Sequence, residues 1–380
     1  WRNNPVQGDP IPMFHFLERN FPSGYLSVPS VGAGTANTEF ECISAMNLDF
    51  FGPGEYPYKT ILQKTACESM AFDMKNLGYK AHAVHNNEAT FYDRHKVFAQ
   101  LGFDTFTPIE YMYDIERNPT GWCKDKVLVG EIEKVLDSSI GSDFVYTISV
   151  QGHGKYPSFE YYCEQIHEMD EFVGQLINML NTRMEPTVLV LYGDHLPGFE
   201  WTAQEMENES LFQTKYVVWN NVNLPAVKRN VEAYQLAAHV LNMLDIHEGT
   251  MLRFHQRHLD AWDTDTQSYL DAMKLLQYDI LYGDHEVYGG ESPYQATQLE
   301  FGVTPIIQGT TVHNTDQVIV FGGQFNIWSK ICVNGKAADT QYYSKTRLIA
   351  KGVEPKEKEE ITVQQVGRDK IHLGTARKKQ

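Results

Sequence analysis

The chain has 380 residues, of which 42% are hydrophobic, and it carries 32 Lys and Arg against 49 Asp and Glu, a formal net charge of −17. This length exceeds what one hydrophobic core usually supports, so two or three domains are expected. The acidic balance argues against a nucleic-acid partner, and also against attachment to anionic lipid by basic residues alone. No stretch reaches the roughly 18–20 uninterrupted apolar residues that a membrane helix needs.

Up to about residue 250, short β-rich runs alternate with longer helical patterns. In chain order the patterns predict a helix at Thr60–Leu77, a strand at Tyr79–Val84, a helix at Lys124–Leu136, a strand at Phe144–Val150, a helix at Tyr161–Leu180, strands at Thr187–Tyr192 and Gln213–Trp219, and a helix at Val231–Leu244. This alternation predicts an α/β fold, with a mostly parallel sheet and helices on both faces.

After about residue 300 no helical period remains. Short strand-like runs at Gln317–Phe321, Ser329–Val333 and Glu360–Gln365 are separated by turn residues, and Asn334-Gly335 is a strong hairpin signal. These runs predict a small all-β sandwich over Thr304–Gly374. We therefore expect an α/β domain over residues 1–290 and a β-sandwich domain over residues 300–376. Five Cys residues without any C-x-x-C pair suggest neither a zinc knuckle nor a disulfide framework.

Three of the predicted strands are followed by a histidine. His85 follows the first, Gln151-Gly152-His153 the second and Gly193-Asp194-His195 the third. Ligands collect beyond the carboxyl ends of strands in such sheets, so these residues are candidates for one shared site. A single loop histidine is more often solvated or structural, and that reading stays open for each. Asp194 and His195 together offer a carboxylate oxygen and an imidazole nitrogen to a divalent cation, Mn²⁺, Zn²⁺ or Mg²⁺.

The pentapeptide LYGDH occurs twice, at Leu191–His195 and at Leu281–His285. The first copy ends an apolar strand, whereas the second follows the helical segment Ser268–Gln277. We therefore assign the metal role to the first copy and a structural or surface role to the second.

The segment VGAGTANTEFE at Val31–Glu41 combines two close glycines with a helix start. Thr38-x-x-Glu41 reads as a capping box, which places Thr35 just before a helix, where free amides favour a phosphate. A metal bound to the Thr35 hydroxyl would lower its pKa and make it a nucleophile. An ordinary glycine-rich turn before a capped helix is the alternative.

Five ordered motifs together resemble one family. They are GAGTANTEFE at Gly32–Glu41, PGEYPY at Pro53–Tyr58, the H-x8-R of His85 to Arg94, SVQGHG-x-YP at Ser149–Pro157 and LYGDHLP at Leu191–Pro197. They are similar to the extracellular catalytic domain of lipoteichoic acid synthase and, more broadly, to phosphoglycerol transferases of the alkaline phosphatase/sulfatase superfamily. The C-terminal run SKICVNGK resembles an Ig-like module that is appended to some relatives.

The resemblance implies roles for individual residues. Thr35 becomes the nucleophile and a metal ligand, with Asp194 and His195 as further ligands, and the metal expected is Mn²⁺, with Mg²⁺ or Zn²⁺ possible. His153 would act beside the phosphoryl group as proton donor or stabiliser. His85, Tyr92 and Arg94, together with His153, would hold the phosphoglycerol group, with Arg94 as a bidentate clamp on phosphate oxygens.

Two departures from the family pattern affect these expectations. Tyr92 stands where the family has Trp, so the glycerol-stacking wall is smaller. The family's fourth metal ligand is a Glu at the end of a strand that precedes this region, and nothing before Thr35 fits it. With three protein ligands and a sheet that lacks a central strand, we expect weak or absent metal binding by this chain.

The resemblance implies transfer of phosphoglycerol from a phospholipid such as phosphatidylglycerol to a hydroxyl acceptor, through a phospho-threonine. It also implies the outer face of a bacterial plasma membrane and an N-terminal membrane anchor that is missing here. A phosphodiesterase is the nearest alternative. A sulfatase is disfavoured because no Cys stands in a C/S-x-P-x-R setting. A catalytically silent module that binds glycerophosphate polymer stays open as well.

Overall fold

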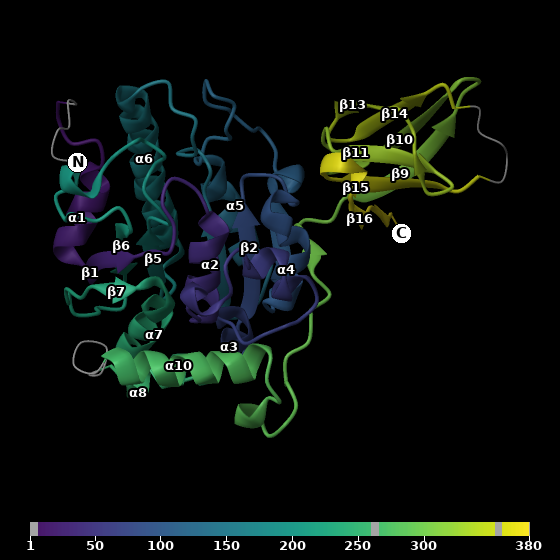
Figure 1. The fold of residues 1–380 in the computed structure, drawn as a ribbon. Coiled ribbons are helices and arrows are strands. Elements are labelled where there is room, and N and C mark those ends of the chain that lie inside the picture. The colour runs from purple at the N-terminus through teal and green to yellow at the C-terminus, as the bar shows by residue number, and fades with distance from the viewer. Residues whose placement is uncertain (1–6, 260–265, 354–358, 380) are drawn as a thin grey trace.

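The computed structural model describes residues 7–259, 266–353 and 359–379. Figure 1 shows an α/β part that contains the N-terminus and, beside it, a smaller all-β part that contains the C-terminus. The predicted fold class, a sheet with helices on both faces followed by an all-β segment, is confirmed.

One half of the α/β sheet is entirely parallel. Its strands are β4 (Asp143–Ile148), β2 (Lys80–His85), β3 (Thr105–Pro108) and β8 (Glu300–Phe301), in that spatial order. The strand β2 is buried along nearly its whole length, which fits a parallel strand covered on both faces. His85 is the last residue of β2, so the sheet delivers it to the carboxyl edge.

The other half of the sheet is mixed. Its strands, in spatial order, are β5 (Val188–Tyr192), β6 (Gln213–Asn220), β1 (Ser23–Ser27) and β7 (Val231–Glu232). β6 runs antiparallel to both β5 and β1. The strand predicted at Gln213–Trp219 is therefore present, but reversed relative to its neighbours.

The two halves do not join through backbone hydrogen bonds. β4 ends one half and β5 ends the other, so each presents an unpaired edge within the described part of the chain. A cavity of about 420 Å³ lies between them and is lined by both strands and by Thr35 and Asp194. The side-chain hydroxyls of Tyr146 and Tyr192 meet across it. The strands of the α/β part that the structure describes thus form two separate half-sheets with this cavity between their edges.

Helices cover both faces of the sheet. α1 (Pro12–Asn20), α5 (Val127–Asp137) and α6 (Phe159–Arg183) pack on one face with the inward side chains Val217 and Trp219 of β6. Six helices pack on the other face, in a core that includes Tyr216 and Val218 of β6. They are α2 (Thr35–Ser44), α3 (Met70–Asn76), α4 (Arg94–Gln100), α7 (Ala233–Met243), α8 (Thr250–Arg257) and α10 (Thr266–Leu281). Successive side chains of β6 thus pack into the cores on opposite faces of the sheet, because side chains alternate between the two faces along a strand.

Two helix predictions were wrong in detail. The helix predicted at Thr60–Leu77 begins only at Met70, because the Ser69 hydroxyl caps it by accepting the Phe72 N–H at 3.3 Å. The capping box at Thr38 and Glu41 is absent, because α2 already begins at Thr35. The Thr38 hydroxyl instead donates to the Asp194 carbonyl, and the Glu41 carboxylate accepts the N–H of Leu48 beyond the helix end.

The C-terminal segment forms two antiparallel-rich sheets. One has the order β13 (Thr340–Ser344), β14 (Arg347–Lys351), β10 (Gln317–Gly323), β9 (Ile307–His313) and β17 (Arg377–Lys378), and the other has β12 (Lys336–Ala337), β11 (Ser329–Val333), β15 (Ile361–Val366) and β16 (His372–Thr375). Asn334 and Gly335 link β11 to β12 with φ of +49° and +78°, so the hairpin prediction is confirmed.

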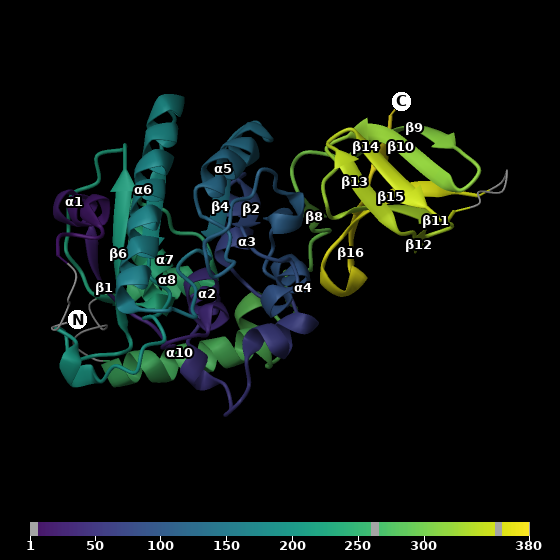
Figure 2. The ribbon, with the colours of Figure 1, turned by 90° about the horizontal axis from the view of Figure 1, so that it is seen from above.

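The all-β segment adjoins the β8 edge of the parallel half-sheet (Figure 2). At the junction the side-chain amides of Asn326 and Gln365 both donate to the backbone carbonyl of Glu110. All three residues are buried. The contact is therefore a desolvated polar connection between the two parts.

All five cysteines are buried and free, in line with the expectation that no disulfide framework is needed. Among the helices that the structure describes, none combines the length and the apolar character needed to cross a bilayer.

Candidate active site

The N-terminus of α2 and the loop after β5 bring three predicted ligands together. Thr35 is the first residue of α2, and its Oγ1 lies 3.4 Å from His195 Nε2. The Asp194 Oδ2 lies 3.4 Å from the same nitrogen. A hydroxyl, a carboxylate and an imidazole thus converge although 160 residues separate Thr35 from His195 in the chain.

Close backbone contacts hold these two segments against each other. The Gly32 N–H donates to the Leu196 carbonyl at 3.0 Å, and the Thr38 hydroxyl donates to the Asp194 carbonyl at 2.7 Å. A Cβ on Gly32 would lie 3.3 Å from the Cα of Gly198. Glycine is therefore needed at position 32, where φ is +73° as well.

The orientation of His195 leaves one nitrogen available for a ligand. Its Nδ1 lies 2.8 Å from the Leu196 carbonyl, and because a carbonyl only accepts, Nδ1 carries the proton. In the neutral ring the lone pair then sits on Nε2, which faces Thr35 and Asp194. A backbone carbonyl that fixes the tautomer in this way is the usual support of a metal-binding histidine.

The donor set fits a divalent cation. Ligand atoms bonded at about 2.1 Å to one ion in a tetrahedral arrangement lie about 3.4 Å apart. The separations of His195 Nε2 from Thr35 Oγ1 and from Asp194 Oδ2 are both 3.4 Å. Only two of the three groups are of the strongly ligating types, and the described residues contain no cluster of three or more His, Cys, Asp and Glu suited to a metal. The three groups are therefore suitable ligands for a divalent cation, but they are few.

A second group of predicted residues gathers at the carboxyl ends of β2 and β4. His85 is buried, its Nδ1 lies 2.9 Å from the Ile148 carbonyl, and its Nε2 has no partner in the structure. Burial, followed by the charge of Arg94, lowers the pKa of His85 well below its usual value. A neutral ring with a free acceptor nitrogen suits a ligand hydroxyl.

His153 is enclosed by aromatic rings. Its centroid lies 4.4 Å from that of Trp122 and 6.2 Å from that of Phe91, while Nδ1 lies 2.8 Å from the Gly154 carbonyl. The Trp122 indole N–H donates to the same carbonyl at 3.0 Å. These contacts fix the ring and leave Nε2 as the nitrogen that can exchange a proton.

Arg94 is placed differently from the expectation. It is 1% exposed, its Nε and Nη2 donate to the two oxygens of the Glu39 carboxylate, and its Nη1 donates to the Phe91 carbonyl. The Nε–Nη2 edge of the guanidinium thus makes a bidentate contact with Glu39 and is not open to a ligand. A phosphate clamp of the kind expected can use only the remaining N–H groups of Nη1 and Nη2.

Tyr92 packs beside this pair. Its ring centroid lies 5.2 Å from the Arg94 guanidinium and 4.8 Å from the Phe91 ring. The backbone of Tyr92 is left-handed, with φ of +56°. Such a conformation is uncommon for an aromatic residue and turns the chain sharply before α4.

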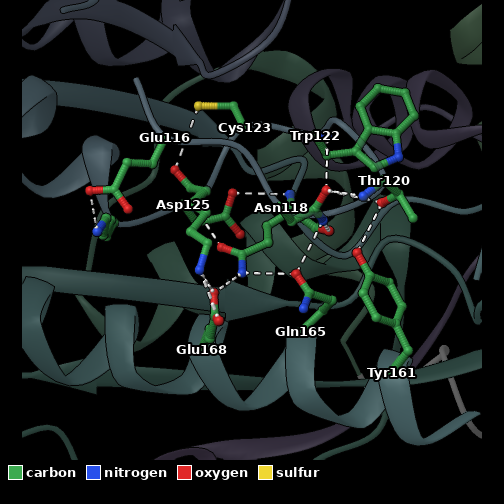
Figure 3. A network of polar contacts seen from close by, with 12 residues as sticks. Glu116, Asn118, Thr120, Trp122, Cys123, Asp125, Tyr161, Gln165 and Glu168 are labelled. Atoms are coloured by element: carbon green, nitrogen blue, oxygen red, sulfur yellow. Dashed lines mark hydrogen bonds and ion pairs between the residues drawn. The ribbon is translucent and has the colours of Figure 1, made fainter. Parts of the chain in front are cut away.

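A network of polar contacts around Asn118 and Asp125 reaches Gln165 of α6 (Figure 3). Through Asp125 it also holds the backbone just before His153. The Asp125 Oδ1 accepts the Asn86 amide at 2.7 Å and the N–H groups of Val150 and Gln151 at 3.1 Å each. Burial raises the pKa of Asp125 to about 6. The Asn118 amide donates to the Gln151 carbonyl at 3.2 Å and completes the connection between the two loops.

The second LYGDH copy lies elsewhere in the fold. Asp284 is exposed and follows α10, and the left-handed His285 begins a short turn. No contact joins either residue to Thr35, Asp194 or His195 among the described interactions. The structure thus brings the first copy, and not the second, to the α2 terminus.

Three further site residues escaped the sequence reasoning. Glu39 lines the same cavity as Thr35 and Asp194 and holds Arg94, so it connects the two residue groups. Its position one helical turn after Thr35 was a usable signal, because residues four apart share a helix face. Trp122 and Asp125 carry no such signal, since their partners come from distant loops.

Comparison with known proteins gives the family. Residues 2–246 match the family model described as Sulfatase, which covers more than half of the chain. The chain belongs to the sulfatase family. The resemblance found from the motifs is thereby confirmed at the level of the superfamily.

Two curated relatives come from Rhizobium meliloti strain 1021. A protein named for cyclic beta-1,2-glucan modification is 26% identical over 259 residues, which is 59% of this chain and 39% of the relative. The capsular polysaccharide biosynthesis protein RkpI is 28% identical over 191 residues, 46% of this chain and 34% of the relative. The chain thus spans well under half the length of either.

Solved structures share the fold at low identity. The phosphoglycerol transferase GacH of Streptococcus pyogenes, solved with sn-glycerol-1-phosphate, aligns with a TM-score of 0.64 at 20% identity over 76% of this chain and 84% of that one. The lipoteichoic acid synthase LtaP of Listeria monocytogenes aligns at 0.53 and 18% identity over 64% and 68%. A Vibrio parahaemolyticus protein of the alkaline phosphatase superfamily aligns at 0.52 and 10% over 95% and 75%.

Proposed function

We propose that the chain is a phosphotransferase that moves a phosphoglycerol group from a phospholipid to a hydroxyl of an envelope polymer or glycan, with Thr35 as nucleophile. The observation that carries the proposal is the convergence of Thr35 Oγ1 and His195 Nε2 at 3.4 Å, beside Asp194. The fold shared with GacH, solved with sn-glycerol-1-phosphate, supports the choice of group.

In the first step the Thr35 oxygen attacks the phosphorus of the phosphodiester. The bond from phosphorus to the diacylglycerol oxygen breaks, and that oxygen takes a proton, for which His153 is our candidate donor. In the second step an acceptor hydroxyl attacks the same phosphorus, the bond to Thr35 breaks, and the acceptor proton returns through the same base. Each step exchanges one P–O bond for another.

Thr35, Asp194 and His195 are the side chains that would hold a divalent cation, for which we propose Mn²⁺. When bound, the cation supplies charge neutralisation and favours the ionised threonine oxygen. Asp194 brings the negative charge, and the Leu196 carbonyl keeps the His195 Nε2 lone pair directed at the site. Three ligands give modest affinity, so we expect Mn²⁺ to bind weakly.

Arg94 and His85 would receive the phosphoglycerol group, and Glu39 would position Arg94. Glu39 fixes the guanidinium, so its unused N–H groups and its positive charge are held ready without a reorganisation cost. His85 Nε2 is an unpartnered acceptor that suits a glycerol hydroxyl. The Tyr92 and Phe91 rings offer an apolar wall for the carbon chain.

A hydrolase is the second candidate, because the matching family model is that of sulfatases. Water in place of the acceptor hydroxyl would release glycerol phosphate from the same phospho-threonine. A sulfatase with a formylglycine nucleophile is disfavoured, because none of the five Cys stands in the C/S-x-P-x-R setting that formylglycine formation needs. The ratio of transferred to hydrolysed phosphoglycerol at rising acceptor concentration distinguishes the two activities.

The proposal extends to location and domain organisation. A membrane phospholipid donor and an envelope acceptor imply action at the outer face of a bacterial plasma membrane. We propose residues 1–290 as the catalytic domain and residues 300–376 as an Ig-like β-sandwich domain. The strand β8 at Glu300–Phe301 falls at the first residues of the Ig-like range but pairs with β3, so these two residues belong to the sheet of the catalytic domain and the connection follows them.

The test is lipid turnover by the purified chain with saturating Mn²⁺, comparing the parent with Thr35→Ala. We expect release of diacylglycerol from phosphatidylglycerol by the parent and a loss of at least about a hundredfold in the variant. Thr182→Ala, on the exposed end of α6, is the matched control and should keep full activity. Binding of glycerophosphate polymer without turnover by the parent would point to a silent binding module.

A further inference from the structure

One face of the C-terminal β-sandwich carries a group of exposed and half-buried apolar side chains. In the sheet β13-β14-β10-β9-β17, Val318, Val320, Leu348 and Ala350 are fully buried in the sandwich core. The residues that alternate with them in β10 and β14 therefore point to the other side. The register places Ile319 opposite Ile349 and Val312, and Phe321 opposite Arg347.

These residues define the outer sheet face. The apolar members are Val312, Ile319, Phe321, Ile349 and, at the bulge of β13, Tyr343, which contacts Arg347. Arg347 and Lys351 lie on the same face, together with the polar side chains of Gln317, Gln341 and Ser344. The exposed fractions are 38% for Val312, 40% for Phe321 and 61% for Tyr343. Exposed apolar residues scattered singly are ordinary, whereas a contiguous group on one flat face marks a contact surface.

Basic side chains frame this apolar surface. The Arg347 guanidinium lies over the Tyr343 ring at 3.5 Å from its centroid, and its buried Nε has no hydrogen-bond partner. Lys351 is exposed at the other end of β14, paired with Gln317. Among the described carboxylates, none forms an ion pair with Arg347 or Lys351. Both cations are thus available to an anionic partner.

The charge of the chain is divided between its two parts. Residues 301–380 contain 12 of the 32 Lys and Arg but only 7 of the 49 Asp and Glu, a net charge of +5. Residues 1–300 hold the other 20 and 42, a net charge of −22. The acidic balance of the whole chain therefore conceals a basic C-terminal module, and an anionic surface would attract that module and repel the rest.

We infer that the outer sheet face docks on an anionic lipid surface. The apolar side chains would enter the region between head groups, while Arg347 and Lys351 would meet lipid phosphates. Apolar burial and charge act together here, so few basic residues suffice. A face that combines Ile319, Ile349 and Phe321 with Arg347 and Lys351 at the two ends of β14 offers an anionic bilayer both apolar side chains and cations. The inference concerns the module alone and does not depend on the proposed chemistry.

The test is cosedimentation of the full chain with vesicles, using phosphatidylglycerol mixed into phosphatidylcholine and phosphatidylcholine alone. We expect binding to the anionic vesicles that weakens as salt is added. Phe321→Ser should reduce the partition coefficient about fivefold to tenfold, because one half-exposed aromatic ring no longer enters the interface. Arg347→Gln with Lys351→Gln should reduce binding to anionic vesicles only.

The matched control is Leu275→Ser, which removes a 72% exposed apolar side chain from α10 in the acidic part. It should leave vesicle binding unchanged. Thermal unfolding of each variant checks that the module is folded. Absence of vesicle binding by the parent, equal binding by Phe321→Ser and the parent, or protection of the face by self-association or by a soluble polysaccharide instead would overturn the inference.

Discussion

Glu39 and Arg94 form a buried ion pair that fixes the position of the Arg94 guanidinium. Both are at most 2% exposed, and the two carboxylate oxygens accept from Nε and Nη2 of the guanidinium. Removing one member of such a pair is costly because the other charge stays buried and unpaired. The pair therefore holds the arginine charge beside the Thr35 cavity at a fixed position.

We expect Glu39→Gln to lower the free energy of unfolding by about 3–5 kcal/mol and to reduce turnover. Urea unfolding and the kcat and KM of lipid turnover are the measurements. Replacing both partners, as Glu39→Leu with Arg94→Met, should restore stability without restoring activity. If the double variant is active, Arg94 has no part in substrate handling and the assignment fails.

The two LYGDH copies offer a direct comparison at the residue scale. Asp194→Ala should remove Mn²⁺ binding and turnover, because the carboxylate near His195 Nε2 is lost. Asp284→Ala, at an exposed turn, should change neither. Calorimetric Mn²⁺ titration and diacylglycerol release test both variants. A larger effect of Asp284→Ala would contradict the placement of the cation site.

At the scale of the element, α2 begins at Thr35, the proposed nucleophile, and carries a buried acid, Glu41, in its last turn. Glu41 is buried and accepts the Leu48 N–H at 2.8 Å, and burial raises its pKa from 4.5 to about 8. The folded state therefore binds this proton more tightly than the unfolded state does. Stability from this group is full below about pH 4.5 and is lost as the pH rises toward 8.

Glu41→Gln keeps an acceptor for Leu48 and removes the titration. We expect the variant to be more stable than the parent at pH 8 by about 1–3 kcal/mol and nearly equal at pH 4.5. Urea unfolding at the two pH values measures this. Parallel stability curves for parent and variant across this range would show that Glu41 is not buried as an acid in the folded protein.

The elements that sequence patterns predicted well are those whose signals are local. Strands ending at His85 and Tyr192 and the long helix around Phe172 were predicted within a few residues, because apolar runs and glycine stops lie within each segment. The first turn of α2 was misread, since Thr38 and Glu41 resemble a cap but serve Asp194 and Leu48. The tertiary contact of Thr38 with the Asp194 carbonyl could not be predicted from the local sequence.

The candidate site shows the same difference between features with a local sequence signal and features that depend on tertiary contacts. Thr35, Asp194 and His195 were predicted together because motif order and strand ends are legible in one sequence. The Glu39 fork on Arg94, the Trp122 contact with His153 and the burial of Asp125 depend on loops that meet only in space. The spacing of residues in the sequence does not indicate that Nε and Nη2 of Arg94 already donate to Glu39.

At the scale of the whole molecule, the all-β part is joined to the α/β part through buried polar contacts. The Asn326 amide donates to the Glu110 carbonyl at 2.8 Å, and Gln365 bonds to the Asn326 side-chain oxygen at 2.8 Å. The face proposed to meet lipid is thus held in a defined orientation to the catalytic part.

Asn326→Ala should leave the Glu110 carbonyl with one donor fewer and lower stability by about 1–3 kcal/mol. We expect increased hydrogen exchange at both sides of the junction, with unchanged exchange at the start of α2. Hydrogen-exchange mass spectrometry measures this pattern, and Asn314→Ala on an exposed turn is the control. Exchange that rises equally over the whole chain would show that the two parts unfold as one unit.

The most direct test of the account is mass spectrometry of the chain after incubation with phosphatidylglycerol and saturating Mn²⁺. The account predicts a phosphoglycerol adduct on the peptide that contains Thr35, absent from Thr35→Ala and enriched when no acceptor is added. Diacylglycerol release without any adduct, or an adduct on another residue that survives Thr35→Ala, would contradict it.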